Sequence, residues 1–334
     1  MDLTPFTPFM GNIDALTHTA SDGAKDYVQP ALKSLGTVSL VVLREVISPA
    51  SFRNAEPEIT DIDVGGHRHI RAVANKFKFG ERARGLQILR HLGAGGNSPQ
   101  NKTTFSGKEK PSAKFDLNTL VFGDSANHGT KVLPVKAAAQ YSDAISVQDY
   151  APSVDATFHN RASEDGSLWD ALKNENSNNL FERHFILPGT ALLQVISFNG
   201  RTAPSQALAH LLFSMGLAGA YGGGTSIYGI NVRNRIVGLY AGRFERDLAS
   251  PYVAITRLRE AGVDREELDK VQAALADLYA SAYPVAMTGA EVEAMQRARI
   301  AELEAGSAPL REEYEDAARK VGSYFDLWFD GVGK

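Results

Sequence analysis

A glycine-dense segment, residues 205–242, separates a helical pattern from a strand pattern and limits what this chain can form. Apolar residues from Ala207 to Met215 fall on one helical face, and the pattern ends at glycines, which cannot continue a stable helix. Alternation from Ile230 to Val237 then predicts a strand. Glycine lets a backbone approach a ligand closely because it has no Cβ. The segment therefore predicts either a loop that binds a polyanion or a turn that serves only packing.

The glycines of this segment are followed by positive charge. They are Gly216, Gly219, Gly222, Gly223 and Gly224. The next charged residues along the chain are Arg233 and Arg235. Unobstructed backbone followed by arginines favours an anionic ligand such as a nucleic acid backbone. We therefore expect both arginines to lie beside the glycine loop and to contact phosphates.

Two nucleotide-binding motifs are excluded. From Gly219 to Ser226 the spacing resembles a G-x-x-x-x-G-K-[ST] phosphate loop, but Thr225 stands in place of the lysine, and the segment follows a helix rather than a strand. No G-x-G-x-x-G follows a strand pattern. No nucleotide cofactor is therefore expected.

Charge is distributed unevenly along the 334 residues, whose net charge is −4. Residues 65–115 contain eleven Lys and Arg against two Glu, a net +9, and residues 260–334 contain sixteen Asp and Glu against eight Lys and Arg, a net −8. Opposed charges of this size favour a protein that binds nucleic acid with one face, although two solvated faces are the alternative.

Cysteine and membrane-spanning patterns are absent from the sequence. Without cysteine, disulfides and thiolate metal sites are excluded, which fits a reducing compartment. No apolar run reaches spanning length, and the first residues lack the signature of an export signal. We therefore expect a cytoplasmic protein with no membrane partner.

Several other stretches predict ordered elements. Val38 to Val46 is an apolar, β-branched strand, and the polar loop after it carries Arg53 and Asn54, whose donors suit phosphate and sugar oxygens unless the loop is an ordinary surface turn. His67 and His69 alternate on another strand pattern, but no third ligand lies close in sequence, so no metal site is expected.

The second half of the chain predicts a hairpin and a helical end. Residues 157–179 are polar and turn-rich and precede a strand from Ala191 to Phe198, which indicates a long projecting hairpin. Earlier in the chain, a helix is expected from Glu81 and a flexible basic loop over residues 93–114. From Gly262 onward the pattern is helical.

Four stretches together resemble one known family. They are VSLVVLREV from Val38, FDLNTLVFGD from Phe115, FERHFILPGTALLQVISF from Phe181 and GLAGAYGGGTSIYG from Gly216. The resemblance is to the backbone subunit of type I-D CRISPR effector complexes, in the Csc branch of the Cas-seven family of the RAMP superfamily. It spans residues 36–257.

This resemblance implies an α+β fold: a modified RNA-recognition (ferredoxin-like) palm with a β-hairpin thumb, a basic lid insertion and a C-terminal helical region. The implied organisation is an N-terminal arm at 1–36, a palm at 37–258 and an acidic helical region at 259–334. Within the palm, the lid occupies 65–115 and the thumb 157–185. The aromatic motif with which ordinary RNA-recognition sheets stack bases is not visible, so such stacking is not expected.

The resemblance further implies that the protein binds guide crRNA without catalysing a reaction. Copies would form a helical filament on the guide, which pairs with a target DNA or RNA strand, and other large, small and guide-end-capping subunits would join them. The implied RNA-binding residues are Arg53, Asn54, Lys76, Lys78, Arg82, Arg84, His159, Arg161, Phe181, Arg183, Gly222, Gly223, Gly224, Thr225, Arg233 and Arg235.

Two other functions stay open. Related type III backbone subunits cut target RNA with an acidic residue in the loop after the first strand, and Asp61 and Asp63 lie in that neighbourhood. A metal-dependent ribonuclease is therefore the main alternative, although no motif identifies either aspartate as catalytic. A stand-alone RNA-binding protein without a filament is the other.

Overall fold

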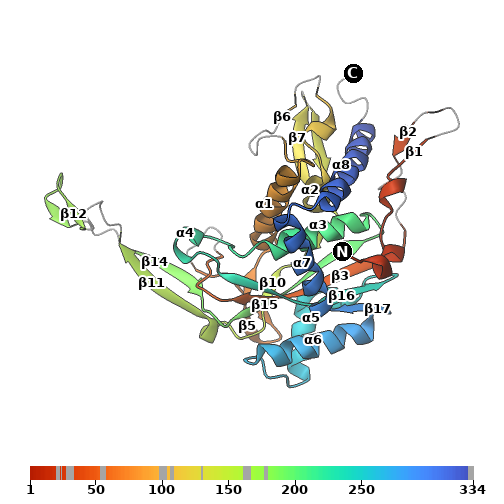
Figure 1. The fold of residues 1–334 in the computed structure, drawn as a ribbon. Helices are drawn as coiled ribbons and strands as arrows, with labels where there is room; N and C mark the ends of the chain where they lie inside the picture. Colours follow the sequence, from red (N-terminus) through yellow and green to blue (C-terminus); the bar gives the residue numbers. More distant parts are fainter. Residues whose placement is uncertain are drawn as a thin grey trace.

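The protein consists of a central antiparallel sheet, helices on both faces of the sheet, and a projecting hairpin (Figure 1). The computed structural model describes residues 1–19, 23, 25–27, 34–52, 58–97, 104–105, 109–128, 131–160, 167–176 and 180–329. The expected combination of helices with an antiparallel sheet is confirmed.

The central sheet has eight strands within the described residues, in the order β17–β16–β3–β15–β10–β5–β4, with β9 paired to β15 beside this path. The strands are β3 (Thr37–Val46), β4 (Asp61–Val64), β5 (His67–Ala72), β9 (Gln140–Tyr141), β10 (Ala144–Ser146), β15 (Ala191–Asn199), β16 (Val232–Gly242) and β17 (Val285–Thr288). β3 and β15 are central and almost wholly buried, as apolar runs without alternation require. Both were predicted, and both are confirmed.

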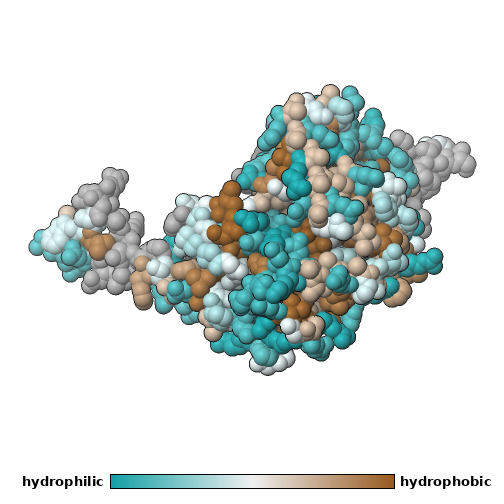
Figure 2. Space-filling view, turned by 60° about the horizontal axis from the view of Figure 1, so that its bottom comes forward, coloured by the Kyte–Doolittle hydropathy of each residue, from teal (hydrophilic) through white to brown (hydrophobic). Residues whose placement is uncertain are grey.

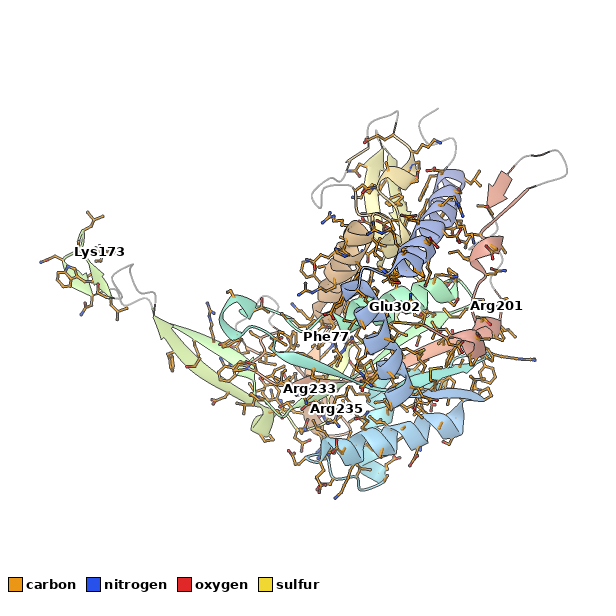
Figure 3. All side chains as sticks on the ribbon, in the orientation of Figure 1. Phe77, Lys173, Arg201, Arg233, Arg235 and Glu302 are labelled. Atoms are coloured by element: carbon orange, nitrogen blue, oxygen red, sulfur yellow. The ribbon has the colours of Figure 1, made fainter. Side chains whose placement is uncertain are left out.

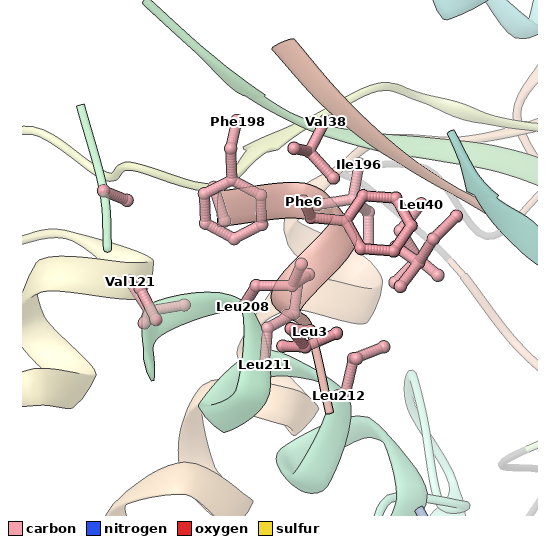
Figure 4. Packing of buried hydrophobic residues seen from close by; sticks show 14 of the residues in the cluster. Leu3, Phe6, Val38, Leu40, Val121, Ile196, Phe198, Leu208, Leu211 and Leu212 are labelled. Atoms are coloured by element: carbon pink, nitrogen blue, oxygen red, sulfur yellow. The ribbon is translucent and has the colours of Figure 1, made fainter. Parts of the chain in front are cut away.

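Helices cover both faces of this sheet. The α-helices of the described residues are α1 (Asn75–Leu92), α2 (Leu117–Phe122), α3 (Ser205–Gly216), α4 (Thr225–Tyr228), α5 (Pro251–Glu260), α6 (Leu268–Ala282), α7 (Gly289–Glu304) and α8 (Ala308–Trp328). Alternate residues of β3 point to opposite faces. Leu40 belongs to the same buried cluster as Leu208 and Leu211 of α3 (Figure 4), whereas Leu43 belongs to a second cluster with Leu275 of α6. Both sheet faces are therefore covered, so the described sheet has no open face on which bases could stack.

The N-terminal residues form part of the core. A 3₁₀ turn at Thr4–Phe9 carries Phe6, which is fully buried with Leu3 and Met10 against β3 and α3 (Figure 4). The predicted arm at 1–36 is therefore anchored along its first part. A two-stranded ribbon follows, made of β1 (Thr17–Thr19) and β2 (Lys25–Tyr27).

The described residues of the basic segment 65–115 lie largely in the body of the protein. β5 is a strand of the central sheet, and α1 packs against α3. The helix begins at Asn75 rather than at Glu81. The rest of the segment leads to a small sheet of β6 (Thr104–Phe105), β7 (Asp124–His128) and β8 (Lys131–Val135).

The described C-terminal residues, 259–329, pack against the rest of the protein. α6 covers one sheet face, and β17, which the sequence did not predict, extends the sheet beside β16. Phe325 of α8 is fully buried, with its ring centroid 5.6 Å from that of Phe115. No helix among the described residues is both long and apolar enough to cross a membrane.

A projecting hairpin follows the short turn after β10. β11 (Val154–Asn160) and β14 (Leu180–Ile186) pair from Val154 and Ile186 at the base to Asn160 and Leu180. Two short strands, β12 (Trp169–Asp170) and β13 (Glu175–Asn176), form its tip, far from the body (Figures 1 and 2). The predicted long hairpin is therefore present.

His210 makes the fold sensitive to acid. It is fully buried on α3, with Nδ1 3.2 Å from Tyr314 Oη and Nε2 3.1 Å from Asn118 Oδ1, and burial lowers its pKa from 6.5 to about 3. Below pH 6.5 His210 is protonated in the unfolded chain, whereas in the folded protein it stays neutral down to a pH of about 3. Stability present above pH 6.5 is therefore lost as the pH falls toward 3.

We expect this histidine to decrease the free energy of unfolding by about 1.4 kcal/mol per pH unit below pH 6.5. Urea unfolding followed by circular dichroism between pH 7 and 5.5 measures the slope, and His210→Gln is its control. A slope that is the same in both proteins would show that another group causes the loss.

Candidate nucleic-acid interface

Three chain segments meet where β3 ends: the residues after β3, the base of β14 and the glycine loop. Ala50 and Ile186 exchange backbone hydrogen bonds, with N–O distances of 3.3 and 2.7 Å, and the Gly223 N–H donates to Ser51 O at 2.9 Å. The loop that leads to Arg53 is thus held between the hairpin and the glycine loop. These three features were expected in the interface, and the structure brings them together.

Aromatic packing joins α1 to this meeting point. Phe77 of α1 lies between Phe52 and Tyr221, with ring centroids 5.0 and 5.1 Å apart, and all three rings are buried. Asn231 closes the glycine loop, because its side chain accepts from Tyr221 N at 2.9 Å and donates to Tyr221 O at 2.8 Å. Tyr221 therefore serves packing, which is one of the two roles that the sequence predicted for this segment. The glycines after it remain at the surface.

The glycines do not play equal roles. Gly222 has φ +74°, and a Cβ there would lie 2.4 Å from Ser51 O. Gly224, at φ +72°, precedes α4 and its first residue, Thr225. A Cβ at Gly223 would meet only Ser51 O, at 3.8 Å. The Gly223 N–H donates to Ser51 O, and this hydrogen bond holds the glycine loop against the residues after β3.

A buried ion pair, which sequence reasoning missed, lies beneath this surface. Arg44 of β3 and Glu81 of α1 have fully buried side chains, with Nη1 2.6 Å from Oε1. Arg44 also donates to Gln194 Oε1 from Nε at 3.1 Å and from Nη2 at 2.7 Å, and to Asn234 Oδ1 at 2.8 Å. Its guanidinium stands 4.7 Å from the Phe77 ring centroid. The sequence signal was an arginine inside a mostly apolar strand.

Two tyrosines complete this network from opposite sides. Tyr141 of β9 donates to Glu81 Oε2, and Tyr221 of the glycine loop donates to Glu81 Oε1 at 3.1 Å. Burial, followed by the charge of Glu81, raises the pKa of both hydroxyls, so both remain protonated donors. The network therefore couples α1, β3 and the glycine loop.

The predicted cations of α1 all retain some exposure. They are Lys76, Lys78, Arg82 and Arg84. Lys78 lies half-buried with Nζ 5.9 Å from the Tyr141 ring centroid, and burial, followed by the charge of Arg82, lowers its pKa. Arg82 pairs with Asp124 at 3.0 Å, whereas exposed Arg84 donates to Gln87 Oε1 at 2.8 Å. α1 thus carries four partly or wholly exposed cations, and its Gly80 packs against Tyr221 of the glycine loop.

Arg233 and Arg235 lie on β16 but not as expected (Figure 3). Arg235 pairs with Asp269 of α6 and donates to Gln272 at 3.1 Å, so it faces the helix on the opposite side of the sheet from Asn234. The structure therefore does not bring Arg235 to the glycine loop. Arg233 is more exposed and lies 3.5 Å from Glu45.

Several predicted contacts lie outside the described residues. Arg53, Asn54 and Arg161 do so entirely, and for His159 and Phe181 only the backbone, in β11 and β14, is described. Arg183 lies on β14 opposite Thr157 and is half-buried.

The aspartates of the ribonuclease alternative lie at the β4 edge of the sheet. Asp61 pairs with Arg68 at 2.5 Å, and Asp63 accepts from Gly66 N at 3.0 Å. His69 is buried, with Nδ1 2.8 Å from Ser146 O and Nε2 3.0 Å from Arg259 Nη2. Among the residues that the structure describes, no group of three or more His, Asp or Glu is placed to hold a metal.

Comparison with known proteins identifies the family. The family model of Csc2 CRISPR proteins matches residues 36–302. The chain belongs to the Csc2 family. The resemblance to the Csc branch is therefore confirmed, while membership of a type I-D complex stays a prediction. None of the curated proteins compared with the sequence matches it.

One solved structure of a Csc2 protein has the same fold. The crystal structure of Thermofilum pendens Csc2 is similar with a TM-score of 0.58 and 14% identity, and the match covers 97% of this chain and 95% of that protein. A chain of a CRISPR RNA-guided surveillance complex in a pre-nicking state has a TM-score of 0.42 and 13% identity over 63% of this chain and 77% of its own. The Csc2-family fold thus extends over nearly the whole chain.

Proposed function

We propose that this Csc2-family protein is the guide-binding backbone subunit of a type I-D CRISPR effector complex. One observation carries the proposal: the hairpin base, the loop after β3 and the glycine loop meet at one surface beside α1, a helix that carries four cations. The protein holds guide crRNA without cutting it, and guide bases pair with a target DNA or RNA strand. Further copies and the large, small and guide-end-capping subunits complete the cytoplasmic complex.

We propose in addition that the palm is a modified RNA-recognition fold. The order of elements β3–α1–β10–β15–α3–β16 and the strand order β16–β3–β15–β10 support this, since they match a ferredoxin-like β-α-β-β-α-β arrangement. The face that such folds leave open carries α5 and α6 here. RNA therefore binds along the end of β3 and the face of α1.

The hairpin acts as the thumb in this proposal. It carries Trp169 and Leu172 at its tip, and Leu172 is 99% exposed (Figure 3 labels the adjacent Lys173). Two exposed apolar side chains at the end of a long arm favour contact with another molecule, which we assign to the next copy on the guide. The hairpin thereby sets the spacing of copies.

The ribonuclease alternative has less support. Asp61 already pairs with Arg68 at the sheet edge, on the strand farthest from β16. Cleavage of bound RNA at regular intervals, abolished by Asp61→Ala or Asp63→Ala, would establish it.

Nuclease protection of bound RNA tests the function. We expect the full-length protein to protect single-stranded RNA at regular intervals. In a shortened variant, Asn-Gly joins Asn160 directly to Leu180, because these residues pair in register and a two-residue turn closes such a ladder. The variant is expected to bind RNA and to lose the regular pattern.

Matching circular dichroism and thermal unfolding of the two proteins would show that the shortened hairpin leaves the body folded. An unchanged pattern would reject the hairpin as the spacing device. Failure of the full-length protein to bind RNA would reject the whole proposal.

A further inference from the structure

A cavity of about 210 Å³ lies beside α1, between this helix and the residues around α2 and β7. Its apolar side comes from α1 alone. Phe79, Ala83 and Leu86 follow one another at helical spacing, and all line the cavity. Leu86 is only half-buried here.

Phe79 lies at the mouth of this cavity, because it lines the cavity and is also 77% exposed. A single exposed phenylalanine is ordinary by itself. This ring differs because it stands over an apolar hollow instead of flat surface. The contacts of the ring are thus incomplete, and a flat apolar partner that enters the cavity would pack against it.

The opposite side of the cavity is charged. Lys114 lines it with a side chain that is only 8% exposed, and its Nζ lies 3.7 Å from Asp124, which Arg82 also contacts at 3.0 Å. Arg90 and Asp116 are the remaining charged residues of the lining. Three cations against two carboxylates leave one positive charge. Since buried lysine is rare, its place here suits an anionic ligand.

We propose that this cavity binds one nucleotide unit, with the base between Phe79 and the wall of Ala83 and Leu86 and the phosphate against the cations. Base stacking on an aromatic ring is tolerant of sequence, because every base has a π face. The volume lies below the roughly 300–1,000 Å³ of sites for drug-sized ligands, so a single base fits better than a longer segment.

The position of the cavity favours a base from bound RNA, and this source rests on the proposed function. Gly80, next to Phe79, packs against Tyr221 of the glycine loop, where a Cβ would lie 3.1 Å from the ring. An RNA strand that leaves the glycine loop along α1 would pass near Phe79. A free mononucleotide offers the same chemistry and is the second source.

Phe79→Ala tests the site in the full-length protein. We expect about tenfold weaker binding of single-stranded RNA, and no loss on an abasic oligomer of equal length, which keeps the phosphates but has no base to stack. Phe244→Ala removes another exposed ring, 57% exposed and remote in sequence, and should change neither affinity. Ala83→Trp fills the cavity without altering charge and should match Phe79→Ala.

Titration with adenosine 5′-monophosphate separates the two sources. Binding that only the wild type shows would assign a free nucleotide, while losses confined to RNA would assign the strand. Equal affinities of wild type, Phe79→Ala and Ala83→Trp for all ligands would overturn the site. Should wild type bind no RNA, the proposed function fails, and the titration with the mononucleotide still decides whether the cavity is a site.

Discussion

Replacing Glu81 by alanine is expected to lower the free energy of unfolding by about 3–5 kcal/mol, because it leaves the charge of Arg44 buried without its anion. Arg44 would keep its bonds to Gln194 and Asn234, but two buried tyrosine hydroxyls would lose their acceptor. Urea unfolding followed by circular dichroism measures the effect. Since such a loss is a large part of the stability of a typical domain, the variant is expected to be only marginally folded.

Two controls make this result specific to burial. Glu260→Ala removes the acid of an exposed pair with Arg257, at 3.5 Å, and should change stability by less than about 1 kcal/mol. The double variant Arg44→Leu with Glu81→Leu should lose less unfolding free energy than the sum of the losses of Arg44→Leu and Glu81→Leu alone, because neither charge is then left buried without its partner. Additive losses would show that the two residues act separately.

Much of the fold could be predicted from the spacing at which hydrophobic residues recur along the chain. β3, β15, α3 and the hairpin were predicted, because their patterns are long and end at glycine, proline or polar residues. β17 was missed, since four residues between two helices carry too short a pattern. The start of α1 was predicted six residues too late. Its first turns bury Phe77 together with Glu81, and a buried glutamate interrupts the apolar pattern by which a helix is recognised in sequence.

The candidate site was only partly predictable. The sequence indicated that the glycine loop and the loop after β3 are functional, and the fold joins them through Ser51 and Gly223. It did not show that Arg235 turns toward α6, because the two faces of a strand are assigned only when their covers are known. The ion pair of Arg44 was missed for a similar reason, because its partner Glu81 lies on another element and the sequence does not show that the two elements pack together.

Gly222→Ala is expected to destabilise the protein by about 2–3 kcal/mol, whereas Gly223→Ala should stay within about 0.5 kcal/mol of wild type. At Gly222 the backbone has φ +74°, and the new Cβ would lie 2.4 Å from a main-chain oxygen, Ser51 O, which cannot rotate away. At Gly223 the nearest atom is the same oxygen at 3.8 Å, an ordinary contact. Thermal and urea unfolding of the two variants measure this difference.

The same pair of variants tests how the loop serves RNA binding. Moving Ser51 displaces the residues that lead to Arg53, so Gly222→Ala should weaken RNA binding about tenfold or more, provided that the measurement is made where the variant is folded. Because no cation is removed, the dependence of affinity on salt should keep the slope of the wild type. Lys76→Ala should instead make the slope shallower by about 0.7, the value for one phosphate contact on a single strand. Equal losses of affinity in Gly222→Ala and Gly223→Ala would show that the loop acts through backbone freedom and not through its contact with Ser51.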